Sequence, residues 1–278
     1  MSIYRRGGCE VQAAAWWKLI EALVRVEDVA PSDSGLLSFG VDAALGGILV
    51  EKGRICWAAA QGMQQRLRDL LQTSAVDRGI DFEWIYERCR AEGRLLGQTL
   101  VEEGWVTPHE LESALRRHSA ESLIALCSDD DELTVWRSRG GNGYSPRFTF
   151  RPIEVLLDVA SLYAPDLQDL ARDQLAAFDA PGRHGAAFCF ASGYAIAVPV
   201  AAFGELTVHE LATLGDWAMA LPLATRELGA TPSFTLAATA AGDTVAVWWR
   251  GELLFAVACD DRSGVAAVVT HHLIEEAA

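Results

Sequence analysis

Residues 137–145, with the sequence RSRGGNGYS, form the stretch of the chain best suited to bind an anion. Backbone N–H groups of a glycine-rich loop can cradle a phosphate, and Arg137 and Arg139 would add positive charge. The stretch lacks the Lys-Ser or Lys-Thr pair of a P-loop, and strand-like residues flank it. The pattern therefore favours a flexible hairpin loop over a phosphate site.

A metal site is conceivable close to the end of the sequence. His271 and His272 lie near Glu275 and Glu276, and His272 and Glu276 are four residues apart. This spacing puts both side chains on one face of a helix, where they could share a metal ion. Two ligands at a fraying terminus make a poor site, and favourable charges at a helix end explain these residues more simply. No metal-binding residue is predicted.

A nucleophilic cysteine is the remaining catalytic possibility. Cys259 precedes Asp260 and Asp261, but neighbouring carboxylates raise the pKa of a thiol, which opposes its activation. The sequence also lacks the G-x-S-x-G elbow of the α/β hydrolases. We therefore predict no catalytic residue, no cofactor and no enzymatic activity. An uncharacterised enzyme is kept as an alternative.

A nine-residue pattern occurs twice in the first half of the chain. Residues 45–53 (LGGILVEKG) and 96–104 (LGQTLVEEG) are identical at six of nine positions. A repeated motif of this type, RLGxxL…G, binds cyclic di-GMP in the N-terminal domains of some secretion ATPases. Here Arg94 comes one residue too early and Ala44 supplies no guanidinium, so bidentate recognition of phosphate or guanine is lost. Chance similarity of two strand–turn units is favoured, and a nucleotide sensor remains an alternative. Its ligand residues would be Leu96, Gly97, Leu100 and Gly104.

Tryptophan is the residue type that points most directly to partners. Trp248 and Trp249 are neighbours in a predicted strand, so their side chains point to opposite faces of the sheet. An outward tryptophan is a candidate anchor for a second subunit or another protein. Alternatively, helices of this chain cover both faces, the N-terminal helix included. The candidate interaction residues are Trp16, Trp17, Trp217, Trp248 and Trp249.

Composition limits the class of protein. Of the 278 residues, 51% are hydrophobic, which is ample for a core, and the net charge of −15 disfavours nucleic acids and anionic membrane surfaces. The six cysteines are widely spaced, as is typical of reduced thiols. No apolar segment follows the two N-terminal arginines, and later apolar runs are too short to span a membrane. We expect a soluble, cytoplasmic protein without membrane insertion.

Hydrophobic periodicity and turn residues predict a mixed α/β order for the first half. The expected helices are residues 10–29, 63–72, 81–91, 107–126 and 152–162. The expected strands are residues 36–39, 47–50, 54–59, 132–137 and 147–150, with residues 51–53 as a hairpin turn. Thr107 and Glu110 have the spacing of a capping box.

The second half has its own order of elements. Helices are expected from 167 to 178, from 208 with a kink or an early end at Pro222, and from 263 to 276. Five strands are expected at residues 186–191, 195–200, 233–239, 244–250 and 253–259. The fold class is α+β or α/β with two domains, residues 1–163 and 164–278. The second contains a five-stranded antiparallel sheet flanked by helices.

Two family resemblances follow. Residues 164–278, with HGAAFCFASGYAIAVPVA and DTVAVWWRGELLFAVACDDRSGVAAVVTHHL, resemble the roadblock/dynein light-chain family. Residues 34–160, with SGLLSF, GGILVEKGRICWAAAQG and LGQTLVEEGWVTPHELESAL, resemble the bacterial PATAN-type signalling domain. The resemblances imply a non-catalytic bacterial adaptor that forms homodimers and regulates a small Ras-like GTPase, or binds a receiver-type signalling protein. Pro222 departs from the long uninterrupted helix of roadblock proteins, which puts their usual dimer surface in question.

Overall fold

The computed structural model describes most of the chain. The described residues are 13–29, 32–40, 45–61, 63, 67, 69–71, 81–128, 134–141, 143–163, 165–191, 196–227, 234–238, 244–259, 264, 266 and 268. The chain divides into a middle unit, Arg25–Asp158, and a terminal unit, Met1–Val24 with Val159–Ala278. Residues 13–24 of the described part of the chain fall in the terminal unit.

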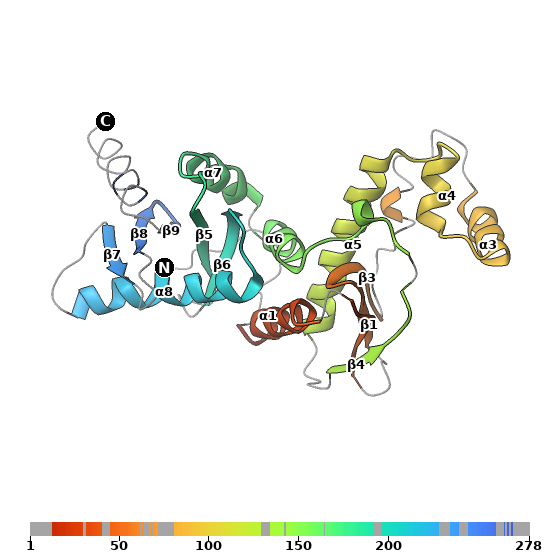
Figure 1. The fold of residues 1–278 in the computed structure, drawn as a ribbon, viewed down its shortest axis with the longest axis horizontal. Helices are drawn as coiled ribbons and strands as arrows, with labels where there is room; N and C mark the ends of the chain where they lie inside the picture. The colour runs from red at the N-terminus through yellow and green to blue at the C-terminus, as the bar shows by residue number, and fades with distance from the viewer. Residues whose placement is uncertain are drawn as a thin grey trace. The chain divides into compact units, whose positions relative to one another are not determined.

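The middle unit contains a four-stranded antiparallel sheet in the order β3-β2-β1-β4. Strands β1, β3 and β4 of this sheet are labelled in Figure 1. Its strands are β1 (Ser34–Phe39), β2 (Gly46–Glu51), β3 (Arg54–Ala60) and β4 (Thr134–Ser138). Lys52 and Gly53 join β2 to β3, and both have positive φ angles, 55° and 72°. A two-residue turn with this geometry matches the twist of an antiparallel pair, so the predicted hairpin is confirmed.

Two helices of the middle unit, α3 (Phe82–Glu92) and α5 (Pro108–Ser128), lie where they were predicted. Helix α4 (Leu96–Glu102) was not predicted, and the predicted helix 63–72 lies largely outside the described residues. Helices α1 (Ala13–Glu27) and α6 (Pro152–Tyr163) each have residues in both units. The capping box of α5 is present, since the Glu110 N–H donates to Thr107 Oγ1 at 3.2 Å and the Thr107 N–H donates to Glu110 Oε2 at 2.7 Å. Leu111, Ala114, Leu115 and His118 form its buried face, as their spacing predicts.

One predicted strand of the middle unit is wrong. Residues 147–150 form a 3₁₀ helix, Pro146–Phe148, followed by a single bridge between Phe150 and Ile55. Pro146 has no N–H to give to a ladder and its ring restricts φ, which favours a turn at this point. The Thr149 hydroxyl also donates to the Pro146 carbonyl at 3.1 Å and stabilises the turn.

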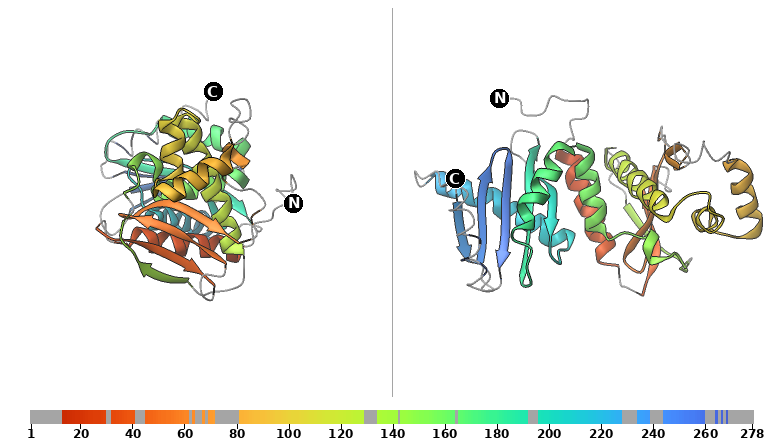
Figure 2. Two further views of the ribbon diagram at one scale, coloured as in Figure 1. Left: turned by 90° about the vertical axis from the view of Figure 1, so that its right-hand side faces the viewer. Right: turned by 90° about the horizontal axis from the view of Figure 1, so that it is seen from above.

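The terminal unit has one five-stranded antiparallel sheet in the order β6-β5-β9-β8-β7, as Figures 1 and 2 show. Its elements are α7 (Pro165–Ala176), β5 (Arg183–Ala191), β6 (Ile196–Phe203), α8 (Val208–Glu227), β7 (Phe234–Ala238), β8 (Thr244–Arg250) and β9 (Leu253–Cys259). Residues 264, 266 and 268 are helical. The five predicted strands and their antiparallel sheet are confirmed, while the pairing of β5 with β9 was not predicted. Most of the predicted final helix, 263–276, lies outside the described residues.

Pro222 does not end α8, because the helix continues to Glu227. The expected early end at this proline is therefore wrong. A proline inside a helix removes one backbone hydrogen bond, but the flanking turns can hold the helix together.

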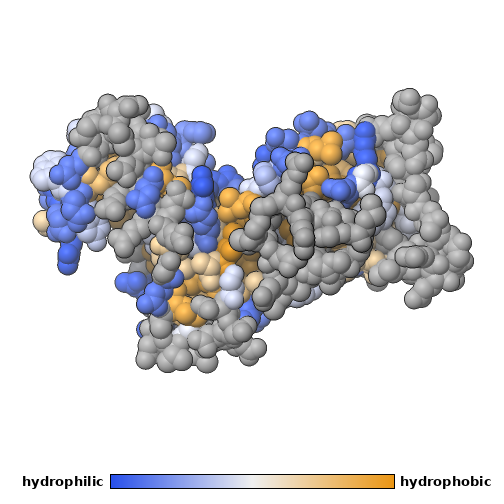
Figure 3. All heavy atoms as spheres, turned by 180° about the vertical axis from the view of Figure 1, so that it is seen from behind, coloured by the Kyte–Doolittle hydropathy of each residue, from blue (hydrophilic) through white to orange (hydrophobic). Residues whose placement is uncertain are grey.

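Burial places one core in each unit. All seven residues of β9 are buried, so both faces of this central strand are covered. On the face of the molecule drawn in Figure 3, hydrophobic side chains gather in patches between hydrophilic ones. Within the described residues, no helix is both long enough and apolar enough to cross a membrane.

Candidate functional site

The paired tryptophans of β8 point to opposite faces of the terminal sheet, as expected. Trp248 is only 5% exposed, with its ring stacked on Phe255 at 5.4 Å and edge-on to Phe178 at 5.2 Å. Trp249 is half-buried beside Phe190, at 5.1 Å between ring centroids. The structure thus places Trp248 in the core and leaves Trp249 partly accessible.

Elements of the same unit contact both of these faces. Phe178 comes two residues after α7 ends, and its ring contacts Trp248 on one face. On the other face, Leu254 pairs with both Trp249 and Phe188, and Gly215 of α8 lies against the Phe188 ring. Trp249 stays partly accessible on this face, so its role as an anchor for a partner remains a prediction.

The remaining predicted tryptophans differ in exposure. Trp16 is buried, Trp217 is half-buried and Trp17 is 48% exposed. Neighbours on a helix lie about 100° apart, so α1 can bury Trp16 while Trp17 faces solvent. Among the five predicted interaction residues, Trp17 alone offers a largely exposed ring.

The edge strand β7 is a surface that the sequence argument missed. Among the described strands β7 pairs only with β8, which leaves the backbone groups on its other side without a neighbouring strand there. Leu236, at the middle of β7, is 47% exposed. The sequence does not reveal this edge, because β7 is the third of five strands in chain order and becomes an edge only through the pairing of β5 with β9.

The candidate ligand residues of the second nine-residue copy lie on or beside α4. The expectation of two strand–turn units is wrong for this copy, because residues 96–102 are helical. Leu100 is fully buried, and Gly97 lies so close to Leu111 that an added Cβ would be 3.1 Å from its side chain. Gly104 has a φ of +73° and ends the turn after the helix. These roles are structural, and nucleotide binding stays a prediction.

Arg94, the arginine of the proposed ligand motif, is surrounded by carboxylates. Its guanidinium donates to Glu102 at 2.8 Å and lies 3.6 Å from both Glu92 and Glu103. The hydrogen bond to Glu102 is the main cause that raises the pKa of Arg94. An incoming phosphate would have to compete with these carboxylates.

The glycine-rich loop at residues 137–145 already binds a carboxylate from its own unit. The Gly143 N–H donates to Glu51 Oε1 at 3.0 Å, and the Tyr144 N–H approaches Glu51 Oε2 at 3.4 Å (a weaker contact). Glu51 ends β2 and is buried. The loop can bind an anion, as its sequence suggested, but the anion here is Glu51. The sequence could not reveal this partner, which lies about ninety residues away.

Cys56 lies close to this carboxylate and is not a nucleophile. Burial, followed by the charge of Glu51, raises the pKa of the Cys56 thiol to about 12. A thiol with this pKa is protonated at neutral pH and therefore unreactive. The other cysteines within the described residues, Cys89, Cys127, Cys189 and Cys259, are also buried and free of disulfides.

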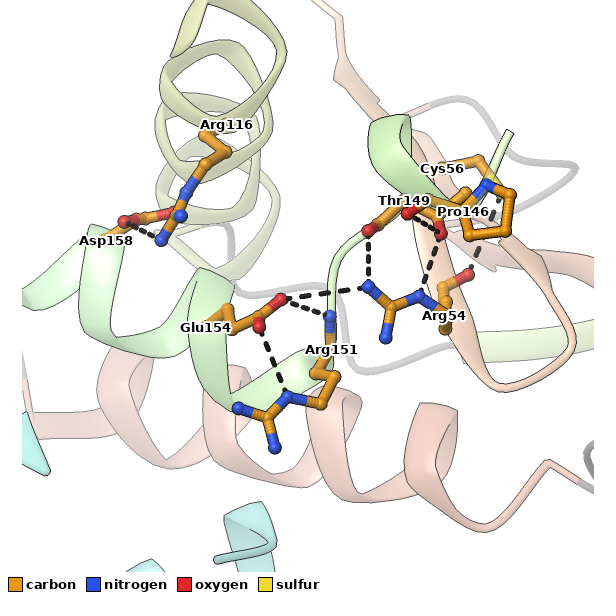
Figure 4. A network of polar contacts seen from close by, with 8 residues as sticks. All are labelled: Arg54, Cys56, Arg116, Pro146, Thr149, Arg151, Glu154 and Asp158. Atoms are coloured by element: carbon orange, nitrogen blue, oxygen red, sulfur yellow. Dashed lines mark hydrogen bonds and ion pairs between the residues drawn. The ribbon is translucent and has the colours of Figure 1, made fainter. Parts of the chain in front are cut away.

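A polar network joins β3 to the segment that leads into α6 (Figure 4). Arg54 donates to the hydroxyl of Thr149 at 2.8 Å and to its carbonyl at 2.6 Å, and lies 4.0 Å from Glu154. Arg116 of α5 makes a bidentate pair with Asp158 of α6, at 2.7 and 2.8 Å. Such pairs fix the geometry between elements, so this network acts in the fold of the middle unit.

His118 is an unusual residue in the core of the middle unit. It is buried, its ring lies 4.4 Å from that of Trp57, and neither of its ring nitrogens has a hydrogen-bond partner. Burial lowers the pKa of His118, opposed weakly by the charge of Glu121 on the same helix. The ring is therefore neutral at pH 7.

In the part of the chain that the structure describes, no group of three or more His, Cys, Asp or Glu side chains could hold a metal ion. His271, His272, Glu275, Glu276, Asp260 and Asp261 lie outside the described residues.

Comparison of the chain with protein-family models, with curated proteins and with solved structures found no match. By its own fold the chain is an α+β protein with two antiparallel sheets.

Proposed function

We propose that this protein is a non-catalytic signalling adaptor. Its terminal unit, which resembles a roadblock domain, would bind a small Ras-like GTPase, a receiver-type protein or a second copy of the chain. The middle unit, which resembles a PATAN domain, would recruit another signalling protein. The order of helices and strands in the terminal unit and its five-stranded antiparallel sheet support the roadblock part of this proposal.

The observation that carries the proposal is the exposed edge of the terminal sheet. Within the described residues no further strand pairs with the outer side of β7, so a partner strand can add at this edge. At β7 the exposed Leu236 and the outer backbone groups offer both apolar contact and hydrogen bonds. Addition of a strand at such an edge is a common way for proteins to associate.

The test is an affinity capture of partners on the intact chain, with the captured proteins identified by mass spectrometry. The proposal expects a Ras-like GTPase, a receiver-type protein or the untagged chain itself, retained at low salt. Leu236→Arg should weaken this capture about ten-fold or more, because a charge on the edge opposes strand addition. Leu170→Arg is the matched control, since Leu170 lies in the same unit and is 48% exposed.

Three outcomes contradict the proposal. One is recovery of the folded bait alone. Another is a partner that binds Leu236→Arg as tightly as it binds the wild type. The third is equal weakening by both arginine variants, which would indicate a general charge effect.

A further inference from the structure

Helix α3 of the middle unit carries a broad exposed face. Only Ile85 and Cys89 of its eleven residues are buried. Trp84 is 56% exposed, the largest exposed fraction among the large hydrophobic side chains of the described residues. An exposed tryptophan ring offers a partner a large apolar contact area together with a π-face.

The Trp84 ring already binds one cation. The guanidinium carbon of Arg88, one helical turn further on, lies 4.5 Å from the ring centroid. Arg88 is held in place by both carboxylate oxygens of Glu103, which also accepts a hydrogen bond from Trp105 Nε1 at 3.0 Å. The network orients the Trp84 ring, and the exposed part of the ring is the part that Arg88 does not cover.

Charge around this ring is negative in excess. Residues 81–104 contain six carboxylates and three arginines. All three arginines are in ion pairs: Arg88 with Glu103, Arg94 with Glu102 and Arg90 with Glu87, the last at 3.9 Å and exposed to solvent. Three more carboxylates than arginines remain in this segment. On an α-helix Trp84, Glu87 and Ala91 share one face at spacings of three and four, and Glu83 borders it. Both glutamates are exposed, so a π-face and two carboxylates lie together at the surface.

We propose that this face of α3, formed by Glu83, Trp84, Glu87 and Ala91, docks a cationic segment of a partner protein. An arginine or lysine of that segment stacks on the open part of the Trp84 ring, and the two glutamates supply the countercharge. A second copy of the chain does not fit, because it carries the same excess of negative charge. The inference rests on the proposed adaptor function and gives the chemistry of the partner that the middle unit recruits.

The probe is a peptide of repeated Ala-Ala-Ala-Arg units, titrated into the full chain by calorimetry. Its counterpart replaces each arginine by citrulline, which is planar and similar in size but uncharged. Trp84→Ala should weaken binding of the arginine peptide about five- to thirty-fold, the range for a cation–π contact at a partly desolvated site. Trp84→Phe should fall between this variant and the wild type, because phenylalanine keeps a weaker π-face.

The matched control is Trp17→Ala, which removes an equally exposed tryptophan from α1 and should leave binding unchanged. Circular dichroism checks that each variant folds. Equal affinity of Trp84→Ala and wild type overturns the proposal, because it would mean that net charge alone attracts the peptide. Equal affinity of the wild type for the citrulline and arginine peptides would also overturn the proposal, because binding would then not require a cation.

The same titration separates this proposal from the adaptor function. Leu236→Arg changes only the edge of the terminal sheet and should bind the arginine peptide as the wild type does. If affinity capture finds no partner but the peptide still requires Trp84, the roadblock proposal fails and the α3 surface stands. If partners are captured but Trp84→Ala binds the peptide as tightly as the wild type does, the α3 proposal fails and the roadblock proposal stands.

Discussion

Two segments of the middle unit share six of nine residues but fold differently. Residues 45–53 form β2 and its hairpin turn, whereas residues 96–104 form α4 and the turn that follows. Both contain Leu-Gly at the start, Leu-Val-Glu in the middle and Gly at the end. A shared local pattern therefore does not decide between strand and helix here.

The first copy is a strand because its surroundings are a sheet. β2 lies between β1 and β3, and its two glycines allow both neighbours to approach closely. A Cβ on Gly46, where φ is +122°, would overlap with the Ala59 carbonyl oxygen, and one on Gly47 would lie 2.7 Å from the Leu37 carbonyl oxygen. Ile48, whose branched side chain favours a strand, is fully buried.

The second copy has a helix-forming residue where the first has Gly47. Gln98 replaces the glycine and donates to Glu102, one helical turn later, at 2.6 Å. Leu100 packs inward and Gly97 lies against a side chain of α5 rather than against a backbone. The differing positions and the neighbouring helices together select the helix.

The first glycine of each copy gives the largest expected difference. Gly46→Ala should cost at least about 3 kcal/mol, since backbone must move and a positive φ is lost. Gly97→Ala should stay within about 1 kcal/mol of wild type, because alanine favours the helix and only the Leu111 side chain must shift. Urea unfolding of the full chain measures both. A similar loss in the free energy of unfolding for both variants would contradict the expected difference between Gly46 and Gly97.

The shared glutamate is expected to differ next. Glu51→Ala leaves the N–H groups of Gly143 and Tyr144 without their acceptor in a partly buried place and should cost about 2 kcal/mol. Glu102→Ala removes an exposed ion pair to Arg94 and should cost less than about 1 kcal/mol. Chemical denaturation and hydrogen exchange of the glycine-rich loop measure these effects. Unchanged exchange in Glu51→Ala would contradict the role of Glu51.

The last glycine of each copy is where the two segments agree. Gly53 and Gly104 have φ angles of +72° and +73°, in the left-handed region. Replacement by alanine should cost about 1 kcal/mol at each position, because the Cβ penalty depends on φ and not on the preceding element. Thermal unfolding of both variants tests this, and a cost at one position alone would contradict it.

The smallest expected effect is a pH dependence of stability that arises from His118 of α5. Because burial lowers the pKa of His118 in the folded protein, the unfolded chain binds more protons below about pH 6.5. His118 should therefore destabilise the protein as pH falls from about 7 toward 5 and have no such effect above that range.

His118→Phe should lose part of this acid sensitivity, and His109→Ala, an exposed control on the same helix, should keep it. Melting temperatures at several pH values measure it. Identical acid sensitivity in His118→Phe and wild type would contradict the prediction.

Much of the fold was predictable because its signals are local. The capping box at Thr107, the hairpin turn at Lys52 and Gly53, and the buried face of α5 each arise from residues within a few positions of one another. The failures have different causes. At residues 96–104 the neighbouring helices helped to outweigh a shared local pattern, whereas at 147–150 the turn at Pro146 is itself local and was overlooked in the strand prediction. At Pro222 only one of the two expected outcomes, the early end of the helix, is wrong.

The candidate sites were less predictable. The opposite orientation of Trp248 and Trp249 follows from strand geometry, but their exposure depends on α7 and α8 packing over the two faces. Trp84 is one of nine tryptophans in the sequence, and the residues next to it do not indicate that its ring is exposed. Its exposure and its contact with Arg88 follow from the placement of α3 beside α4 and Glu103.

By itself the sequence determined the elements, their order and the excess of negative charge, because periodicity, capping, turns and composition are properties of short segments or of the whole chain. Only the tertiary structure decided that one nine-residue copy is a strand and the other a helix. It also decided that Glu51 binds the glycine-rich loop and that Trp84, rather than Trp248, faces solvent. The physical reason is the same each time. Burial and hydrogen bonding to residues far along the chain outweigh local preferences of about 1 kcal/mol per residue or less.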